Sequence, residues 1–293
     1  MALNKLDLYR REFLGEIAMD ILHQDETMLV NIADKSNKAS KNVSVCLANE
    51  LGGALCSEKI VGQTAGNLFA QKVKIFLEKS FHELRHINPT MWEIHTEKEI
   101  YLYEQYNHLQ VIKELIETNK KLETIIGIDY LVKPDIVIIR NPLSDKDIGY
   151  DKHPPKIAQA TPLRADAENN SNVAILQGIV SCKWTIRSDR AQNTRTEAQN
   201  IIRNRKGRTP CITAITAEPL PSRIASLALG LGDLDCVYHM ALYELEEAIK
   251  KALSKENMKN SRKALEEQIN TLQVLINGKR LRDVSDLPLD LIT

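Results

Sequence analysis

The sequence has few cysteines, no long apolar run and no N-terminal targeting pattern. Its five cysteines are widely spaced and form no C-x-x-C pair, so we expect neither a zinc site nor a disulfide framework. No apolar run reaches the roughly 18 residues that a transmembrane helix needs. The N-terminus also lacks the basic-then-apolar pattern of a signal peptide. These absences predict a cytoplasmic protein that does not associate with membranes.

Aromatic residues and net charge are scarce as well. Aromatics make up 5% of the 293 residues, so Leu, Ile, Val and Ala must fill most of the core that 43% hydrophobic residues allow. Acidic and basic residues balance at 39 each, so no global field attracts the chain to nucleic acid. From Lys183 to Arg208, however, eight basic residues stand against two acidic ones, a local excess of six. We expect any anionic partner to bind near this segment.

Apolar periodicity predicts both helices and strands along the chain. The predicted helices cover residues 4–23, 43–55 with a break near Gly52-Gly53, 68–86, 97–120, 188–204, a short piece after Ser222, 236–254 and 260–277. The predicted strands cover residues 129–140, 173–186 and 211–217, and loops are expected at 31–42, 62–67 and 143–170. With no internal repeat, this pattern predicts one α/β domain over residues 1–293, with helical elaborations at both ends.

Two charged residues interrupt the predicted strands. Asp135 follows Pro134 inside one apolar strand, and Lys183 closes another. Because a buried carboxylate is costly unless it is paired, protonated or metal-bound, Asp135 needs a partner. An aspartate and a lysine on neighbouring strands suit metal-dependent phosphodiester hydrolysis, in which the lysine orients the nucleophile or stabilises charge. Each residue alone could instead be a strand-end side chain that faces solvent.

The usual nuclease signature has a second acid two residues before the lysine, where this chain has Ser181. Glu197, on the following predicted helix, is the expected substitute. It lies seven residues after Arg190, so the two side chains share a helix face. On its own, Glu197 could equally be a solvated helix residue.

The start of that helix carries side chains that suit base reading. Arginine can fork onto guanine, and a carboxylate can accept from cytosine, so Arg187, Asp189 and Arg190 favour contacts in the major groove. A solvated helix start is the alternative. The later Arg203, Arg205, Lys206 and Arg208 are more typical of phosphate or solvent contacts.

With these motifs, the chain resembles type II restriction endonucleases of the NgoMIV kind, in the group that reads CCGG cores. The resemblance runs from Asn31 to the C-terminal tail and is densest in residues 181–193, 204–208 and 217–230. It implies a restriction-endonuclease-like (PD-(D/E)XK) α/β fold with a central mixed sheet flanked by helices. It also implies a variant nuclease site in which the second acid has moved to the helix.

The resemblance assigns roles to the motif residues. Mg²⁺ would be held by Asp135 and the backbone carbonyl of Cys182, with Glu197 supporting a second metal position. The residues that would read bases are Arg187, Asp189 and Arg190 at the inner C·G pairs, Asp34 and Arg223 at the outer pair with Ser36 close by, and Gln63 from the minor groove. The implied partner is double-stranded DNA with the sequence GCCGGC, cut to leave 5′ overhangs. The implied assembly is a homotetramer of two back-to-back dimers.

One position departs from the family pattern: the family's glutamate is Ala70 here. Glu78 lies about 12 Å farther along the predicted helix, and Gln71 points about 100° away, so neither replaces it easily. Ala70 is either a natural change that reduces metal affinity or a deliberate truncation that keeps binding and suppresses cleavage. The deliberate truncation is favoured, because the chain keeps the family's residue at every other matched functional position.

The function hypothesis is therefore a Mg²⁺-dependent, sequence-specific DNA endonuclease. Two alternatives stay open. One is a protein that binds DNA without cutting it, and the other is a repair or recombination nuclease of the same superfamily.

Overall fold

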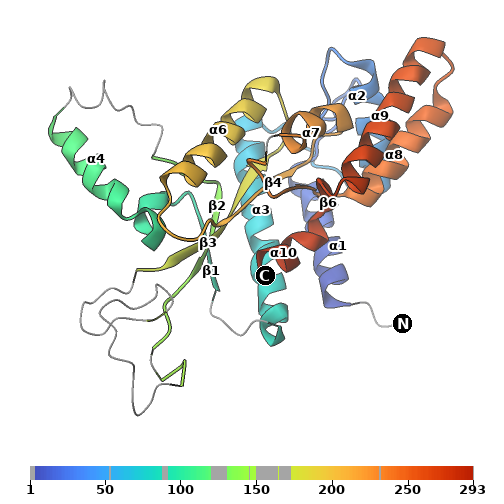
Figure 1. Cartoon of the computed structure of the whole chain (residues 1–293). Coiled ribbons are helices and arrows are strands. Elements are labelled where there is room, and N and C mark those ends of the chain that lie inside the picture. The colour runs from blue at the N-terminus through green and yellow to red at the C-terminus, as the bar shows by residue number, and fades with distance from the viewer. Residues whose placement is uncertain are drawn as a thin grey trace.

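A six-stranded mixed sheet forms the centre of the protein, seen here in a computed structural model (Figure 1). The structure describes residues 4–52, 54–87, 92–119, 131–144, 146–149, 164, 173–230 and 232–292. The strands, in their order across the sheet, are β1 Trp92–Thr96, β2 Ile136–Arg140, β3 Ile175–Lys183, β4 Cys211–Thr216, β5 Cys236–His239 and β6 Leu281–Asp283. Strand β2 is antiparallel to both of its neighbours, β1 and β3, and β3 to β6 run parallel.

Strand register explains which residues meet at the edge of the sheet. Ile136, the first residue of β2, pairs with Val180 near the end of β3. In an antiparallel pair the start of one strand lies beside the end of the other. The residue before β2, Asp135, is therefore brought beside the last residues of β3, which end at Lys183.

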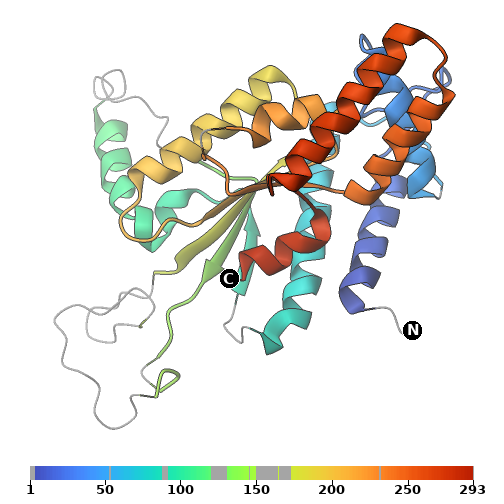
Figure 2. The same cartoon turned by 45° about the vertical axis from the view of Figure 1, so that its right-hand side comes forward.

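Helices cover both sides of the sheet. They are α1 Lys5–Asp20, α2 Lys38–Leu51, α3 Gly62–Glu83, α4 His108–Thr118, α6 Ser188–Asn204, α7 Pro221–Ala228, α8 Leu242–Lys255, α9 Lys259–Asn277 and α10 Leu287–Leu291. Short 3₁₀ helices cover Leu84–His86, Ile100–Leu102, Glu104–Tyr106 and Val284–Asp286. Helix α3 packs against β1 and β3, and α1 packs against α3. Helices α6 and α7 pack against each other on the opposite side of the sheet (Figures 1 and 2).

The predicted α/β class and mixed sheet are confirmed, and several elements have the predicted bounds. Helix α6 covers residues 188–204 as expected, because Ala191, Thr194, Ala198 and Ile201 form one buried face at helical spacing. The helix predicted over 43–55 ends at Leu51, where Gly52 takes a positive φ of 58°. Most of the connection predicted over residues 143–170 lies outside the described residues.

Other predictions were wrong. Residues 236–254 form strand β5 and then α8, because periodicity does not distinguish a short buried strand from buried helix. The polar stretch 62–67 is the start of α3 and not a loop. Residues 97–120 include two 3₁₀ helices before α4, and β1 and β6 were missed. Within the described ranges, no helix combines the length and the apolar character needed to cross a membrane.

Candidate functional site

The first candidate site is a cavity of about 520 Å³ where β2 begins and β3 ends. We call it the Lys183 pocket. Its walls are the first turns of α3, the residues after β1, the end of β3 and one face of α6. Trp184 fixes two of these walls, since its ring packs edge-on against Phe69 of α3 with centroids 5.4 Å apart.

Asp135 and Lys183 meet in this pocket. One carboxylate oxygen of Asp135, Oδ2, accepts hydrogen bonds from Lys183 Nζ at 3.0 Å and from the backbone N–H of Cys182 at 2.7 Å. Asp135 directly precedes β2 rather than lying within it, and its backbone carbonyl still accepts from the N–H of Glu97 at 3.2 Å. Burial lowers the pKa of Lys183, but Asp135 and then Glu197 outweigh it and leave that pKa raised. Lys183 therefore carries a positive charge at neutral pH.

Glu197 enters the same pocket from α6. Burial raises the pKa of its carboxyl, Lys183 opposes this shift, and Asp135 adds to it. In the described part of the chain, neither the Glu197 carboxylate nor Oδ1 of Asp135 accepts a hydrogen bond. The Lys183 pocket thus receives two carboxylates and one lysine from three different elements.

These groups fit a divalent cation only in part. Carboxylate and carbonyl oxygens are the ligands that Mg²⁺ prefers, and Asp135, Glu197 and the backbone at Cys182 offer them. Among the described residues, however, no group of three or more His, Cys, Asp or Glu side chains is placed to hold a metal ion. Ala70 lines the pocket, at the position where the resemblance described above predicts a carboxylate. Glu97 also lines it, but its side chain is 68% exposed and lies 3.6 Å from Lys133.

Two other predicted positions are buried. Ser181 is only 4% exposed and is not part of the pocket wall, so it contributes no oxygen there in place of the usual acid. It pairs with Ala214 inside the parallel part of the sheet. The Cys182 thiol is buried as well, and burial raises its pKa well above the usual value. Its sulfur therefore stays protonated, and its contact with Asp135 is through the backbone N–H.

The second candidate site is a larger cavity, about 990 Å³, which we call the Arg223 pocket. Its walls are residues 31–35 before α2, the β3–α6 connection with the start of α6, and one side of α7. Arg187 lines this pocket, whereas Arg190 and Gln63 line the Lys183 pocket. Asp189 is exposed in the first turn of α6. The predicted Arg187–Asp189–Arg190 reader is thus divided between two cavities.

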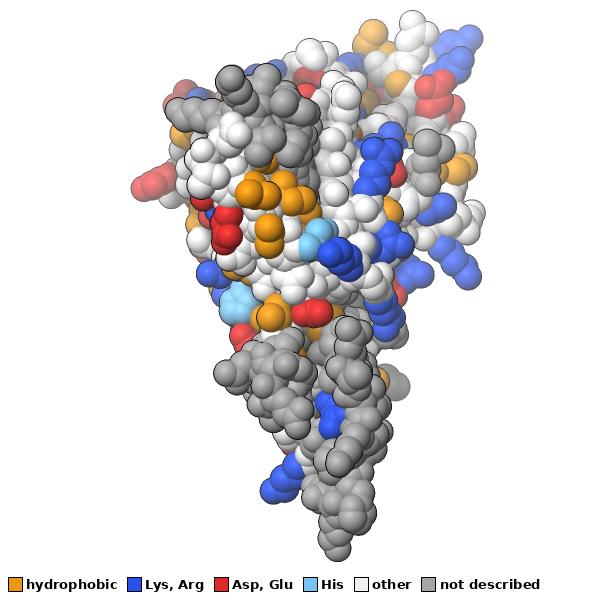
Figure 3. Space-filling view, turned by 60° about the vertical axis from the view of Figure 1, so that its left-hand side comes forward, with side chains coloured by type: hydrophobic (Ala, Val, Ile, Leu, Met, Phe, Trp, Pro, Cys, Tyr) orange, Lys and Arg blue, Asp and Glu red, His pale blue; other side chains and the backbone are white. Residues whose placement is uncertain are grey.

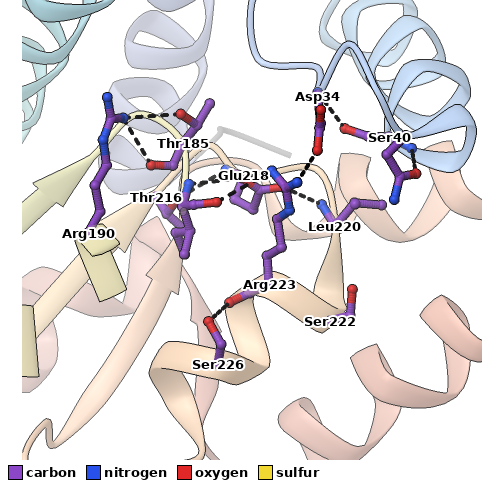
Figure 4. A network of polar contacts seen from close by, with 12 residues as sticks. Asp34, Ser40, Thr185, Arg190, Thr216, Glu218, Leu220, Ser222, Arg223 and Ser226 are labelled. Carbon is purple, nitrogen blue, oxygen red and sulfur yellow. Dashed lines mark hydrogen bonds and ion pairs between the residues drawn. The ribbon is translucent and has the colours of Figure 1, made fainter. Parts of the chain in front are cut away.

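Several residues predicted to contact bases form hydrogen bonds or ion pairs with other residues of the protein. The Arg223 guanidinium donates to Asp34 (Figure 4). Asp34 also accepts from the N–H of Ser36 at 2.9 Å and from its hydroxyl at 2.7 Å. Those bonds from Ser36, together with Arg223, lower the pKa of Asp34. Arg190 donates to the carbonyl of Thr185 at 3.3 Å and to its hydroxyl at 3.2 Å.

The basic segment continues beyond both pockets. Arg203, Arg205, Lys206 and Arg208 are exposed at and after the end of α6. On the face that brings α4 forward, lysine and arginine side chains form a band along one edge (Figure 3). Such a band suits contacts with a phosphate backbone.

Comparison with known proteins places the chain in a family. The family model described as NgoMIV restriction enzyme matches residues 9–293. The chain belongs to this family. It is 40% identical over 298 residues to the type II restriction enzyme NgoMIV of Neisseria gonorrhoeae, covering 99% of each chain. The resemblance inferred from the motifs is therefore confirmed.

A solved structure is also similar over most of the chain. The complex of restriction endonuclease PspGI with substrate DNA is 14% identical, with 98% of this chain and 91% of that chain covered and a TM-score of 0.29.

Sequence reasoning missed one residue of the Arg223 pocket's support. Glu218 is fully buried just after β4, and burial raises its pKa to about 7. The available signal was its place: like Asp135 and Lys183, it is a charged residue at or close to one end of an apolar strand.

Proposed function

We propose that this protein is a Mg²⁺-dependent type II restriction endonuclease that cuts double-stranded DNA at GCCGGC and leaves 5′ overhangs. The observation that carries the proposal is the contact of Lys183 Nζ with Asp135 Oδ2 in a pocket that also receives Glu197. Family membership adds the expectation that this pocket cleaves DNA.

The roles in cleavage follow from the charges. Asp135 and the carbonyl of Cys182 would hold the cation, with Glu197 supporting a second position. When bound, the cation supplies Lewis-acid polarisation of the phosphate and a more acidic water. Lys183 stays protonated, so it stabilises the negative charge that grows on the phosphate oxygens. Asp135 holds the Lys183 ammonium in place through its Oδ2 atom.

The roles in recognition divide between the two pockets. Arg223 and Asp34 would read the outer base pair, and Ser36 orients Asp34 through its two hydrogen bonds. Arg187, Asp189 and Arg190 would read the inner pairs, while Gln63 approaches the minor groove. Residues 1–293 would act as one endonuclease domain, in the cytoplasm, as a homotetramer of two back-to-back dimers.

The test uses a linear duplex that contains one GCCGGC site. With Mg²⁺, two fragments with 5′ overhangs are expected, and a duplex with a scrambled site should stay intact. Cutting of unrelated DNA at branches or nicks would instead indicate a repair or recombination nuclease.

A second candidate is a protein that binds GCCGGC without cutting it. Ala70 favours it, since the Lys183 pocket lacks a carboxylate at that position. A gel shift run beside the cleavage assay separates the two candidates, because tight specific binding without product supports the second. If the Ala70→Glu variant also leaves the duplex uncut, the assignment of the cleavage site is wrong.

A further inference from the structure

Glu218 connects two of the three chain segments that line the Arg223 pocket, the β3–α6 connection and α7. Its Oε2 atom accepts from the backbone N–H of Ile186, the residue before Arg187, at 2.9 Å. Its Oε1 atom accepts from the backbone N–H of Leu220 at 3.2 Å, at the start of α7. A single side chain therefore ties the β3–α6 connection to the helix that carries Arg223 (Figure 4).

Because Glu218 is buried, the loss of either hydrogen bond would be costly. The side chain has no exposed surface, and both Ile186 and Leu220 are buried as well. A buried N–H group without an acceptor costs roughly 1–3 kcal/mol. An apolar residue at position 218 would leave two such groups unpaired. Only a side chain with two acceptor atoms satisfies both segments in this arrangement.

Glu218 also faces the guanidinium of Arg223. Their nearest nitrogen and oxygen atoms are 4.0 Å apart, and Arg223 Nη1 lies 3.5 Å from the carbonyl oxygen of Ile186. Arg223 is thus held between Asp34 on one side and Glu218 with Ile186 on the other. If a base took the place of Asp34, Glu218 would remain as the countercharge that keeps Arg223 aimed into the pocket.

We propose that Glu218 is a positioning residue for DNA recognition, which fixes Arg187 and Arg223 relative to each other without touching the DNA. The proposal rests on the proposed function, because it assumes that these two arginines contact bases. It makes the preference for the outer base pair depend on a carboxylate that has no access to solvent.

The test compares the wild-type chain with Glu218→Gln by fluorescence anisotropy in metal-free buffer, where no duplex is cut. The pH is kept above 7, because the pKa of Glu218 is about 7 and its carboxylate carries the charge only above that value. Glutamine keeps one acceptor oxygen but points an NH₂ group at the second N–H, and it removes the charge beside Arg223. Three duplexes are used: GCCGGC, the same site with its outer pair changed to ACCGGT, and an unrelated sequence. We expect the variant to lose about tenfold in affinity for GCCGGC. Its preference over ACCGGT should largely disappear, and its affinity for the unrelated duplex should not change.

Asp235→Asn is the matched control. The Asp235 carboxylate also accepts from a backbone N–H, that of Ile212 at 2.7 Å, but at the opposite end of β4. This variant should keep the wild-type preference. Glu218→Asp is the second test variant, since it keeps the charge but is too short to reach both N–H groups, and we expect an intermediate preference.

Each outcome decides between a positioning role and a purely structural one. If Glu218 only stabilised the fold, both Glu218 variants would lower the melting temperature and the active fraction, yet the folded fraction would keep the wild-type preference. That result would overturn the positioning role alone. If instead the wild-type chain preferred none of the three duplexes, the proposed target would fail, and the positioning role with it.

Discussion

The two pockets on either side of the β3–α6 connection differ in how their polar groups are satisfied. In the Arg223 pocket, the groups proposed to read DNA pair with one another: Arg223 with Asp34, and Asp34 with Ser36. In the Lys183 pocket, Asp135 binds Lys183 through one oxygen only. Glu197 carries a raised pKa because it is buried near another carboxylate and its one favourable charge, Lys183, only partly offsets this.

This difference shows how each pocket responds to a ligand. A recognition pocket with internal pairs discriminates well, because a wrong base leaves a displaced Asp34 or Arg223 without a partner. A pocket with unsatisfied carboxylates instead attracts a cation, which replaces the missing countercharge. Specificity and metal dependence would then have largely separate origins: substituting a carboxylate of the Lys183 pocket should leave the preference for a sequence intact, and substituting Asp34 or Arg223 should leave the metal dependence intact.

The largest expected effect comes from Asp135→Asn. Asparagine keeps an acceptor for the Cys182 N–H but removes the charge proposed to hold the cation. We expect single-turnover cleavage of the GCCGGC duplex to fall by roughly 10³-fold or more. If wild-type product is below detection, the measurement is made in the Ala70→Glu background. Affinity for the uncut duplex should stay within about twofold, since the Arg223 pocket is untouched. A variant that binds poorly would contradict the separation of the two pockets.

Arg223→Ala should have the next largest effect, on affinity and not on chemistry. The substitution removes the proposed contact with the outer pair and leaves Asp34 without its countercharge. We expect affinity for GCCGGC to fall roughly ten- to a hundredfold, measured by anisotropy. Arg262→Ala is the control, because Arg262 is an exposed arginine on α9 that pairs with Glu266. A similar loss in both variants would mean that Arg223 contributes only general positive charge.

Sequence reasoning located the Lys183 pocket better than it located the Arg223 pocket. Asp135 and Lys183 each interrupt an apolar strand, so strand patterning alone indicated that they could meet. Arg223 is held instead by Asp34, 189 residues away in the sequence, and lies beside the carbonyl of Ile186 in a loop. No spacing rule predicts such a contact.

The fold, like the site, was predictable in part. Helix α6 and strand β4 have clear periodicity, and their bounds agree with the prediction within one residue. Strand β5 has four buried residues followed at once by the amphipathic helix α8, so the two patterns merged into one predicted helix. The support from Glu218 was missed for another reason. Its place after an apolar strand indicates a buried charge, but the backbone N–H groups that it binds, those of Ile186 and Leu220, carry no signature in the sequence.

A smaller effect is expected from Ala70→Glu, which sharpens the comparison by adding a carboxylate to the Lys183 pocket. Ala70 lies at the pocket wall, one residue from the buried Phe69. A third carboxylate should strengthen cation binding by about tenfold, measured from Mn²⁺ binding by electron paramagnetic resonance, and cleavage should rise with it. Ile75→Glu adds the same charge at an exposed position of α3 and should change neither quantity. Unchanged Mn²⁺ affinity in Ala70→Glu would show that the Lys183 pocket is not the metal site.

The smallest expected effect is on how stability depends on pH, and it tests whether the buried polar groups behind the Arg223 pocket act as described. Burial raises the pKa of Glu218 to about 7 from 4.5 and lowers that of His239, on the adjacent β5, to about 4 from 6.5. Asp34 and Arg223, which also face Glu218, keep their charges in this range, since the pKa of Asp34 is lowered and arginine is effectively always protonated. Between pH 4.5 and 6.5 the folded chain therefore holds a proton on Glu218, and the unfolded chain holds one on His239.

Because each state binds one of these two protons, the pair contributes no slope to the stability of the wild-type chain in this range. Glu218→Gln removes the folded-state proton, so its stability relative to wild type should fall as the pH drops from 6.5 to 4.5, by about 1 kcal/mol per pH unit. His239→Gln removes the unfolded-state proton and should produce the opposite slope. Urea unfolding at several pH values measures both differences, in which all other titrating groups cancel. Parallel stability curves for the three chains would show that Glu218 is ionised in the folded protein throughout this range, as a carboxylate fully compensated by Ile186, Leu220 and Arg223.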